Sequence, residues 1–154
     1  MSDNSSSSEF SLVFQTVRQQ ARLLADGEIS SQELVTAHLN QIERVNPSVN
    51  AIVTLVSESA LDQAKAADKL RISGVRVGPL HGMPVLIKDL QDTKGILTTQ
   101  GSPIYRNHIP ERDALIVDRL KKAGAIVIGK SNTPEFGAGS QTFNSVFGVT
   151  CNPY

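Results

Sequence analysis

The sequence predicts an α/β fold, in which helices pack against a sheet. Two short segments, residues 84–88 (PVLIK) and 125–128 (AIVI), are apolar runs typical of buried strands. Between them, apolar residues recur at helical spacing from about residue 113 to 122. A strand, a helix and a second strand in this order indicate a right-handed crossover between parallel strands.

The first half of the chain is expected to be mainly helical. Apolar residues recur at helical spacing over residues 10–25. A second helix begins with a capping box, because Ser30 and Glu33 can each bond the other's backbone amide. This helix is expected to end just before Pro47, which has no N–H to continue the ladder. Residues 57–70 are predicted to form a third helix with one apolar face.

Two further strands are expected beside the central pair. Residues 50–56 (NAIVTLV) are rich in β-branched side chains, and residues 95–99 (GILTT) follow the same trend. From residue 130 onward the chain is rich in Gly, Ser, Asn and Thr. Such a composition suits a long loop over one edge of the sheet.

The helix between the central strands has its own boundary signals. Asp113 is a suitable N-cap and Gly124 a suitable residue for the position just past the end. Within it, the pattern predicts that three side chains face inward: Leu115, Ile116 and Leu120.

Composition and charge disfavour several classes of function. Lys+Arg and Asp+Glu both number 15, so nothing favours binding to nucleic acid or to an anionic membrane surface. No apolar run reaches the roughly 20 residues that a membrane span needs. Residues 1–9 are polar and serine-rich, which predicts a disordered tail rather than a signal peptide, and a cytoplasmic location. The one cysteine is Cys151, and no His or Cys has metal-ligand spacing, so we expect neither a metal nor a cofactor.

One pattern suggests nucleotide binding. Residues 124–131 (GAIVIGKS) match the P-loop expression GxxxxGK[ST]. A P-loop follows a strand and wraps phosphate with backbone amides, whereas here the middle residues are themselves strand-like. Nucleotide binding is therefore the less favoured hypothesis.

Lys88 has an unusual position at the end of an apolar strand, directly before Asp89. Burial penalises a charged lysine, so a lysine held there either pairs with a carboxylate or loses its proton near neutral pH. A neutral lysine can act as a general base. The alternative is a side chain that extends from the strand end into water or pairs with an acid.

Many short motifs resemble those of the amidase signature family. They follow one order and spacing from about residue 12 to the end of the chain. The most specific are residues 78–89 (GPLHGMPVLIKD), 95–102 (GILTTQGS), 124–132 (GAIVIGKSN) and 147–154 (FGVTCNPY). The resemblance implies a mixed sheet sandwiched by helices and an enzyme that hydrolyses amide bonds. It also argues against a P-loop, because the family has a GK[ST]N segment without nucleotide chemistry.

The resemblance further implies a Ser–Ser–Lys triad, in which Lys88 matches the catalytic lysine. In the family, the neutral lysine takes a proton from a middle serine, which relays it from the nucleophilic serine. The nucleophile forms an acyl-enzyme, and backbone amides beside it hold the oxyanion. Residues 136–140 resemble a stretch that lines the substrate pocket, which makes Gly137, Ala138 and Gly139 candidates for substrate binding.

The chain departs from the family in one large respect. The glycine- and serine-rich signature that carries both catalytic serines follows the NPY-like segment in the family, and Ser102, Ser131 and Ser140 do not match those serines. We therefore expect residues 10–154 to be the N-terminal part of an amidase domain with an incomplete sheet, inactive alone. A small-molecule amide is the expected substrate of the full-length form, with a complementing C-terminal portion or a second copy as partner. The alternative is a non-catalytic interaction or regulatory module derived from an amidase.

Overall fold

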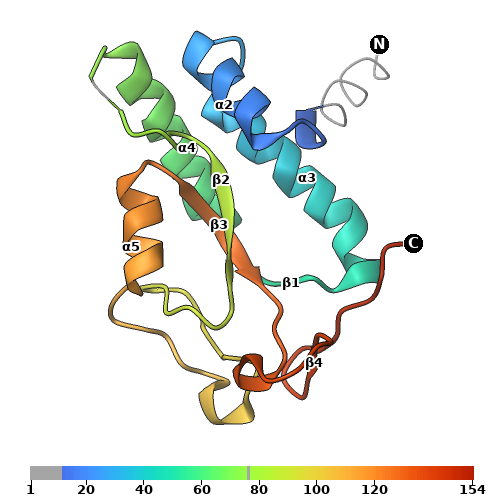
Figure 1. The fold of residues 1–154 in the computed structure, drawn as a ribbon. Coiled ribbons are helices and arrows are strands. Elements are labelled where there is room, and N and C mark those ends of the chain that lie inside the picture. Colours follow the sequence, from blue (N-terminus) through green and yellow to red (C-terminus); the bar gives the residue numbers. More distant parts are fainter. Residues whose placement is uncertain (1–11, 76) are drawn as a thin grey trace.

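The computed structural model describes residues 12–75 and 77–154 (Figure 1). The tail expected over residues 1–9 lies outside this range. In chain order, the elements are α2 (Val17–Asp26), α3 (Ser31–Val49), β1 (Ile52–Leu55), α4 (Ser57–Ile72), β2 (Pro84–Lys88), η1 (Pro103–Tyr105), α5 (Leu115–Lys122), β3 (Ile126–Ser131), η2 (Glu135–Gly137), β4 (Phe143–Asn144) and β5 (Gly148–Val149).

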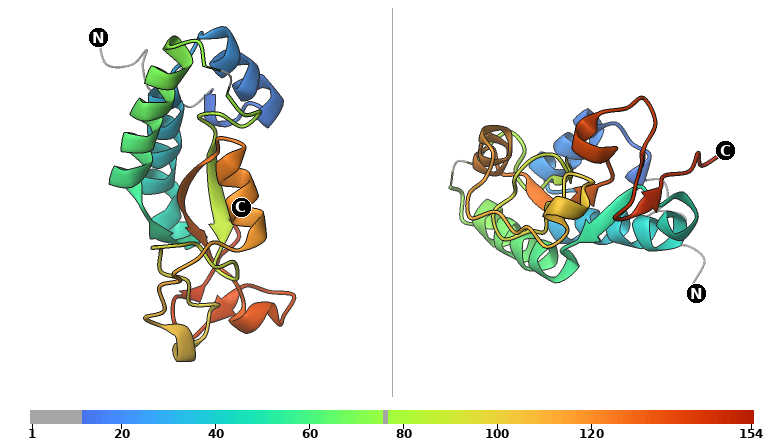
Figure 2. Two further views of the ribbon diagram at one scale, coloured as in Figure 1. Left: turned by 90° about the vertical axis from the view of Figure 1, so that its left-hand side faces the viewer. Right: turned by 90° about the horizontal axis from the view of Figure 1, so that it is seen from below.

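The central sheet has the strand order β1-β3-β2. Strand β3 runs parallel to β2 and antiparallel to β1, so the sheet is mixed. Helices α3 and α4 cover one face and α5 covers the other, as Figure 2 shows edge-on. The prediction of an α/β fold with a mixed sheet between helices is confirmed.

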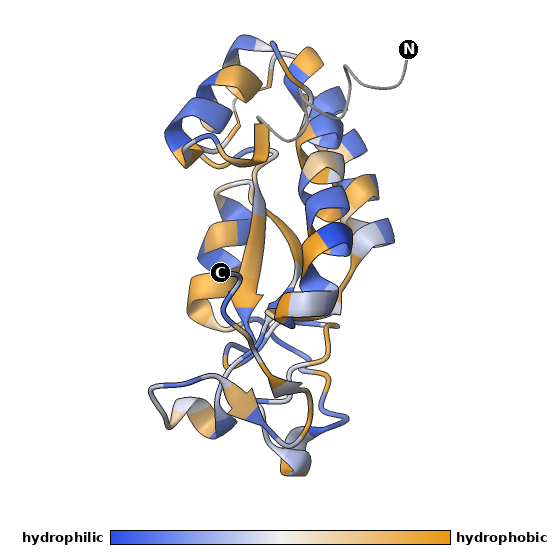
Figure 3. Cartoon of the chain, turned by 90° about the vertical axis from the view of Figure 1, so that its right-hand side faces the viewer, coloured by the Kyte–Doolittle hydropathy of each residue, from blue (hydrophilic) through white to orange (hydrophobic). Residues whose placement is uncertain are grey.

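Two apolar clusters fill the layers on either side of the sheet. On the α3 and α4 side, Ile126 and Ile128 pack against Val35 and Ala64. On the α5 side, Val117 packs with residues of β2 and β3. Figure 3 shows the hydrophobic residues gathered along the two central strands. Within residues 12–75 and 77–154, no helix is long and apolar enough to cross a membrane.

The helix predicted over residues 10–25 is interrupted. Leu12 and Val13 are helical, residues 14–16 are not, and α2 then starts at Val17, where a capping box between Thr16 and Gln19 sets its N-terminus. Residues 10 and 11 lie outside the described part of the chain.

Helix α3 begins as predicted and ends later. The Ser30–Glu33 capping box is present. The predicted end before Pro47 is wrong, because the helix continues through this proline to Val49. It ends where Asn50 adopts a left-handed conformation, with φ of 52°, and donates its amide to the Asn46 carbonyl.

Helix α5 packs through a different face from the one predicted. Leu115 and Ile116 are 65% and 54% exposed, whereas Val117 is fully buried and Leu120 packs beside it. Asp113 does not cap the helix, because its carboxylate accepts instead from the Lys94 amide and from Lys121 Nζ. The expected end is confirmed, because Gly124 has a positive φ of 95° just after the helix.

The strand predicted over residues 95–99 is wrong. This segment is an irregular loop, whose threonine side chains bond to buried charged groups instead of facing a sheet. Gly95 has a φ of 74° and Gln100 a φ of 54°, so the backbone turns at both ends of the segment. The loop follows β2 directly and therefore starts immediately after Lys88.

Candidate functional site

Lys88 is the last residue of β2, at the carboxyl end of the parallel pair. Its register partner on β3 is Ser131, which is also the last residue of its strand. The loops after both strands gather at this end of the sheet (Figure 1). In α/β sheets, ligands bind in the crevice outside the carboxyl ends of the strands.

The Lys88 side chain is exposed rather than buried. Within residues 12–75 and 77–154, no hydrogen bond or ion pair is formed by its amine. The structure therefore shows the solvent-exposed side chain of the second interpretation, without an acid as its partner among the described residues. The role of Lys88 as a general base stays a prediction. The Lys88 amine is accessible to a group that binds at the carboxyl end of the sheet.

The glycine-containing segment predicted to line the substrate pocket lies against the loop that follows Lys88. The Phe136 amide donates to the Gln100 carbonyl at 2.8 Å. A Cβ atom on Gly137 would approach Leu90 Cδ1 to 2.7 Å, and the φ of 72° at this position favours glycine. Ala138 and Gly139 are exposed. The structure therefore places Gly137 in contact with a residue two positions after Lys88.

Beneath this loop lies a buried lysine that the sequence did not single out as functional. Lys130 is completely buried. Its Nζ donates to the Gln91 carbonyl at 2.6 Å, to Thr93 Oγ1 at 2.9 Å and to Thr98 Oγ1 at 2.8 Å. Burial lowers the pKa of Lys130 to about 8, and the nearby carboxylates of Asp89 and Asp92 oppose this shift.

A buried carboxylate accompanies this lysine. Asp89 is fully buried and accepts hydrogen bonds from the Thr99 amide at 3.2 Å and from Thr99 Oγ1 at 2.5 Å. Burial raises the pKa of Asp89, while the bonds from Thr99 and the charge of Lys130 act in the opposite direction. We call Asp89, Lys130, Thr93, Thr98 and Thr99 the polar network. Its signal in the sequence was a lysine inside an apolar strand together with three threonines in one loop.

The segment that matches the P-loop expression does not form a phosphate-binding loop. Residues 126–131 are strand β3, so the residues between the two glycines are extended. The Lys130 amine bonds inside the protein and is not available to a phosphate. The geometry that nucleotide binding requires is absent from this segment.

The histidines and serines of the described residues form no catalytic pair. His38 Nε2 lies 3.3 Å from Gln20 Nε2, and burial lowers the pKa of His38, as expected for a structural histidine. Ser102 Oγ donates to Glu135 Oε1 at 2.6 Å. No group of side chains with metal-ligand chemistry is present in residues 12–75 and 77–154.

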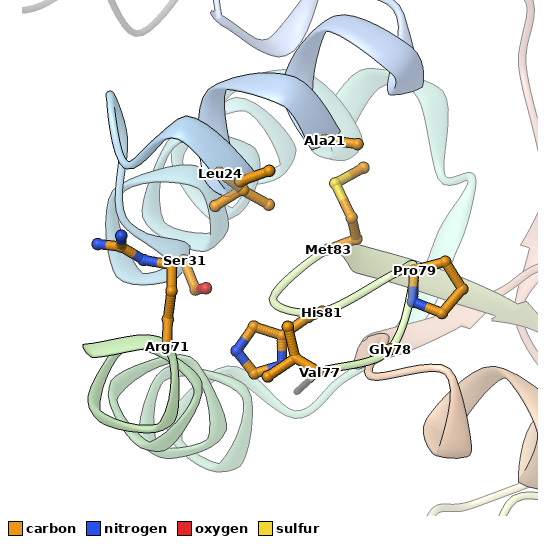
Figure 4. A pocket seen from close by; sticks show the side chains of 10 residues that line it. Ala21, Leu24, Ser31, Arg71, Val77, Gly78, Pro79, His81 and Met83 are labelled. Carbon is orange, nitrogen blue, oxygen red and sulfur yellow. The ribbon is translucent and has the colours of Figure 1, made fainter. Parts of the chain in front are cut away.

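An apolar cavity of about 270 Å³ lies near the opposite end of β2 (Figure 4). Its walls include Leu24, Val77 and Met83, and Met83 directly precedes the strand. The Arg71 guanidinium stands at its edge, where Nη1 lies 2.7 Å from the position of a Cβ on Gly27. Lys88 is not among the lining residues, so this cavity is separate from the candidate site.

The chain thus has an α/β fold, in which a mixed sheet has helices on both faces. Its candidate site is the carboxyl end of the parallel strands, where Lys88 lies. The family model for amidases matches residues 33–154. The chain belongs to the amidase family, whose members include the amidase signature enzymes.

Known proteins are similar to this chain in sequence and fold. A glutamyl-tRNA(Gln) amidotransferase subunit of Dehalococcoides mccartyi is 46% identical over 143 residues, which are 93% of this chain and 29% of that protein. Fatty acid amide hydrolase superposes with a TM-score of 0.88 at 27% identity, over 94% of this chain and 26% of that one. A chain of a vestigial protein complex connected with the origins of an s-triazine catabolic enzyme has a TM-score of 0.85 at 34% identity, over 90% and 31% of the two chains. The chain thus spans less than a third of the length of these proteins.

Proposed function

We propose that this chain is the N-terminal part of an amidase, which hydrolyses a carboxylic amide to an acid and ammonia or an amine through a serine acyl-enzyme. In this proposal, Lys88 is the general base. The observation that carries it is the position of Lys88 at the carboxyl end of β2, exposed and with its amine unpaired among the described residues. Membership in the amidase family supports the type of reaction.

The chemistry proposed for Lys88 requires its amine to act as a proton acceptor at this end of the sheet. The amine accepts the proton of a middle serine, which in turn accepts the proton of the nucleophilic serine. The serine oxygen attacks the amide carbonyl, and the amine or ammonia of the substrate leaves with the proton that Lys88 had accepted. Water then cleaves the acyl-enzyme. Both serines would come from residues outside this chain, because Ser102, Ser131 and Ser140 do not match them.

The proposed substrate is a small-molecule amide, which would bind beside the turn that contains Gly137, Ala138 and Gly139. Contact between Gly137 and Leu90, two residues after Lys88, supports this placement. The proposed partner is a C-terminal portion that completes the site, or a second copy of the chain, in the cytoplasm. One relative is named as one of the subunits of an amidotransferase and one solved neighbour belongs to a complex, which supports a partner of this kind.

The proposal is tested with the full-length protein that carries this chain, in wild-type form and as Lys88→Ala. A fluorophosphonate probe reports an activated serine without knowledge of the substrate, and ammonia release from a panel of primary amides reports hydrolysis. We expect Lys88→Ala to lose both signals by roughly three orders of magnitude or more, because members of a catalytic unit act together. Lys69→Ala, an exposed lysine on α4, is the matched control and should retain both.

Two results would count against the proposal. Near-wild-type labelling and hydrolysis in Lys88→Ala would remove this lysine from the catalytic machinery. A wild-type protein that is folded but neither labelled nor hydrolytic would favour the non-catalytic module instead.

A further inference from the structure

We propose that Lys130 and Asp89 are positioning residues for Lys88, which act by holding the junction between β2 and the loop that follows it. This inference rests on the proposed function, because it assigns the polar network a role in that same reaction. Neither residue is placed in contact with the substrate.

The first part of the junction is fixed through the backbone and through Lys130. The Asp89 amide donates to the Ser131 carbonyl at 2.9 Å, and the Lys88 carbonyl accepts from the Gln91 amide at 2.9 Å. Lys130 Nζ then holds the Gln91 carbonyl at 2.6 Å. The peptide group that follows Lys88 is therefore tied to β3 at both of its polar atoms, directly through the Asp89 N–H and by way of Gln91 through the Lys88 carbonyl.

The rest of the loop is folded over the same two buried charges. Thr93 and Thr98 accept the remaining two N–H groups of Lys130. The Asp89 carboxylate binds Thr99, and the Asp89 carbonyl accepts from the Gln100 amide at 2.9 Å. A displacement of Lys130 would release three points of the loop at once.

The geometry of the strands separates this role from catalysis. Lys130 is the register partner of Ile87, and Lys88 is the partner of Ser131. Because successive side chains of a strand point to opposite faces, Lys130 and Lys88 lie on opposite faces of the sheet. Lys130 acts on Lys88 through the backbone and not through side-chain contact.

The energetic cost of the network favours a role beyond stability. Burying an ammonium and a carboxylate carries a large desolvation penalty, and well-packed apolar residues often stabilise a protein as well or better. Here Lys130 binds the Gln91 carbonyl and the Asp89 carboxylate binds Thr99, so both ions hold the loop that follows Lys88. A small displacement of a catalytic group lowers the rate, since about 1 Å of misplacement can cost about 100-fold.

The experiment uses the full-length protein and two pairs of variants. Thr98→Val removes one acceptor of Lys130 with little change of shape, and Thr98→Ser retains it. Lys130→Met removes all three hydrogen bonds, and Asp89→Asn removes the charge of the carboxylate. The readouts are kcat and KM for the best amide of the panel, and circular dichroism as a measure of folding.

We expect Thr98→Val to lower kcat roughly tenfold and Lys130→Met about 100-fold, with KM nearly unchanged, because a displaced Lys88 slows chemistry without changing the pocket. Thr98→Ser should restore wild-type kcat. Wild-type kcat in Thr98→Val, or a loss in Thr98→Ser equal to that in Thr98→Val, would overturn the proposal even if Lys130→Met does not fold. Loss of activity in Lys88→Ala alone, with all network variants active, would uphold the proposed function and refute the positioning role.

Discussion

The ammonium group of Lys130 has three protons and meets three oxygen acceptors, from Gln91, Thr93 and Thr98. A neutral amine has only two donors, so one buried oxygen would lose its partner on deprotonation. The hydrogen bonds therefore favour the charged form, while burial disfavours it. Burial outweighs the charges of the nearby Asp89 and Asp92 carboxylates and leaves the pKa of Lys130 at about 8, so the side chain is mostly protonated at neutral pH.

This balance predicts a dependence of stability on pH. The folded chain releases the Lys130 proton near pH 8, whereas the unfolded chain holds it up to about 10.5. Between these values the unfolded state binds more protons, so the free energy of unfolding rises with pH. The rise is on the order of 3 kcal/mol. Urea unfolding of wild type and of Lys130→Met, each near pH 7 and near pH 10, measures this rise. The same change in the free energy of unfolding between the two pH values in both proteins would contradict the prediction.

The Asp89–Thr99 pair makes a second prediction at this scale. Thr99→Val keeps the side-chain shape but removes the hydroxyl that donates to the buried carboxylate at 2.5 Å. A buried acceptor that loses a donor costs about 1–3 kcal/mol. Denaturant titration should show this loss of stability in Thr99→Val and little change in Thr99→Ser. Equal stabilities of the two variants would show that the Thr99 hydroxyl does not contribute to stability.

At the scale of elements, the starts of α2 and α3 are set by side chains that bond the first free amides. Ser30 Oγ accepts from the Glu33 amide at 3.0 Å, and Glu33 returns a bond to the Ser30 amide at 2.8 Å. Bonding to Ser30 lowers the pKa of Glu33. The same arrangement at Thr16 and Gln19 sets the start of α2.

Ser30→Ala should therefore destabilise the chain by about 1 kcal/mol, because it removes the cap of the longest helix among the described residues. Thermal unfolding followed by circular dichroism measures the effect, with Ser30→Thr as the variant that keeps the oxygen acceptor. If alanine and threonine give the same melting temperature, the capping box contributes nothing to stability.

Elements with a local signal were predictable from sequence. Strand β2 has the predicted bounds, Pro84 to Lys88, and α3 has the predicted cap. Elements whose structure depends on distant partners were not. The residues 95–99 have strand-like composition, but Lys130 and Asp89 bind their threonines and hold them as a loop. On α5 the inward positions predicted for Leu115 and Ile116 were wrong and that of Leu120 was right, because the position of the sheet, which periodicity does not contain, selects Val117.

The candidate site was predictable only in part. Lys88 was found from the motif around it, and its catalytic role stays a prediction. The polar network was missed because Lys130 belongs to a pattern that resembles a nucleotide-binding loop. The hydrogen bonds of Lys130 reach residues 32 to 39 positions away in the chain, and a short sequence window does not show which loop supplies these partners.

At the scale of the whole molecule, the central sheet has two open sides within the described residues. Strands β1 and β2 are its edges, and only β3 is paired on both sides. Several large apolar side chains are also exposed, including Leu86 at 38%, Leu115 at 65% and Ile104 at 79%. Unpaired edges and apolar surface favour association with another chain or segment.

The chain is therefore expected to self-associate as its concentration rises. Leu115→Lys should weaken this association with little effect on stability, because the side chain is mostly exposed. Light scattering coupled to size-exclusion chromatography measures it. Ala66→Lys, at an exposed position of α4 without a large apolar side chain, is the control for added charge alone. A wild-type chain that stays monomeric, or an equal effect of both variants, would contradict the expectation.

The hydrogen bond between Lys130 and Gln91 spans 39 positions of the chain, and this separation has a consequence for biosynthesis. The ribosome completes Lys88 and its loop well before it adds the lysine on which the loop closes. During this interval the segment after β2 has no ammonium to fold around, and the buried threonine oxygens remain in water. The backbone at Lys88 thus acquires its final geometry only after β3 has been synthesised and has docked beside β2.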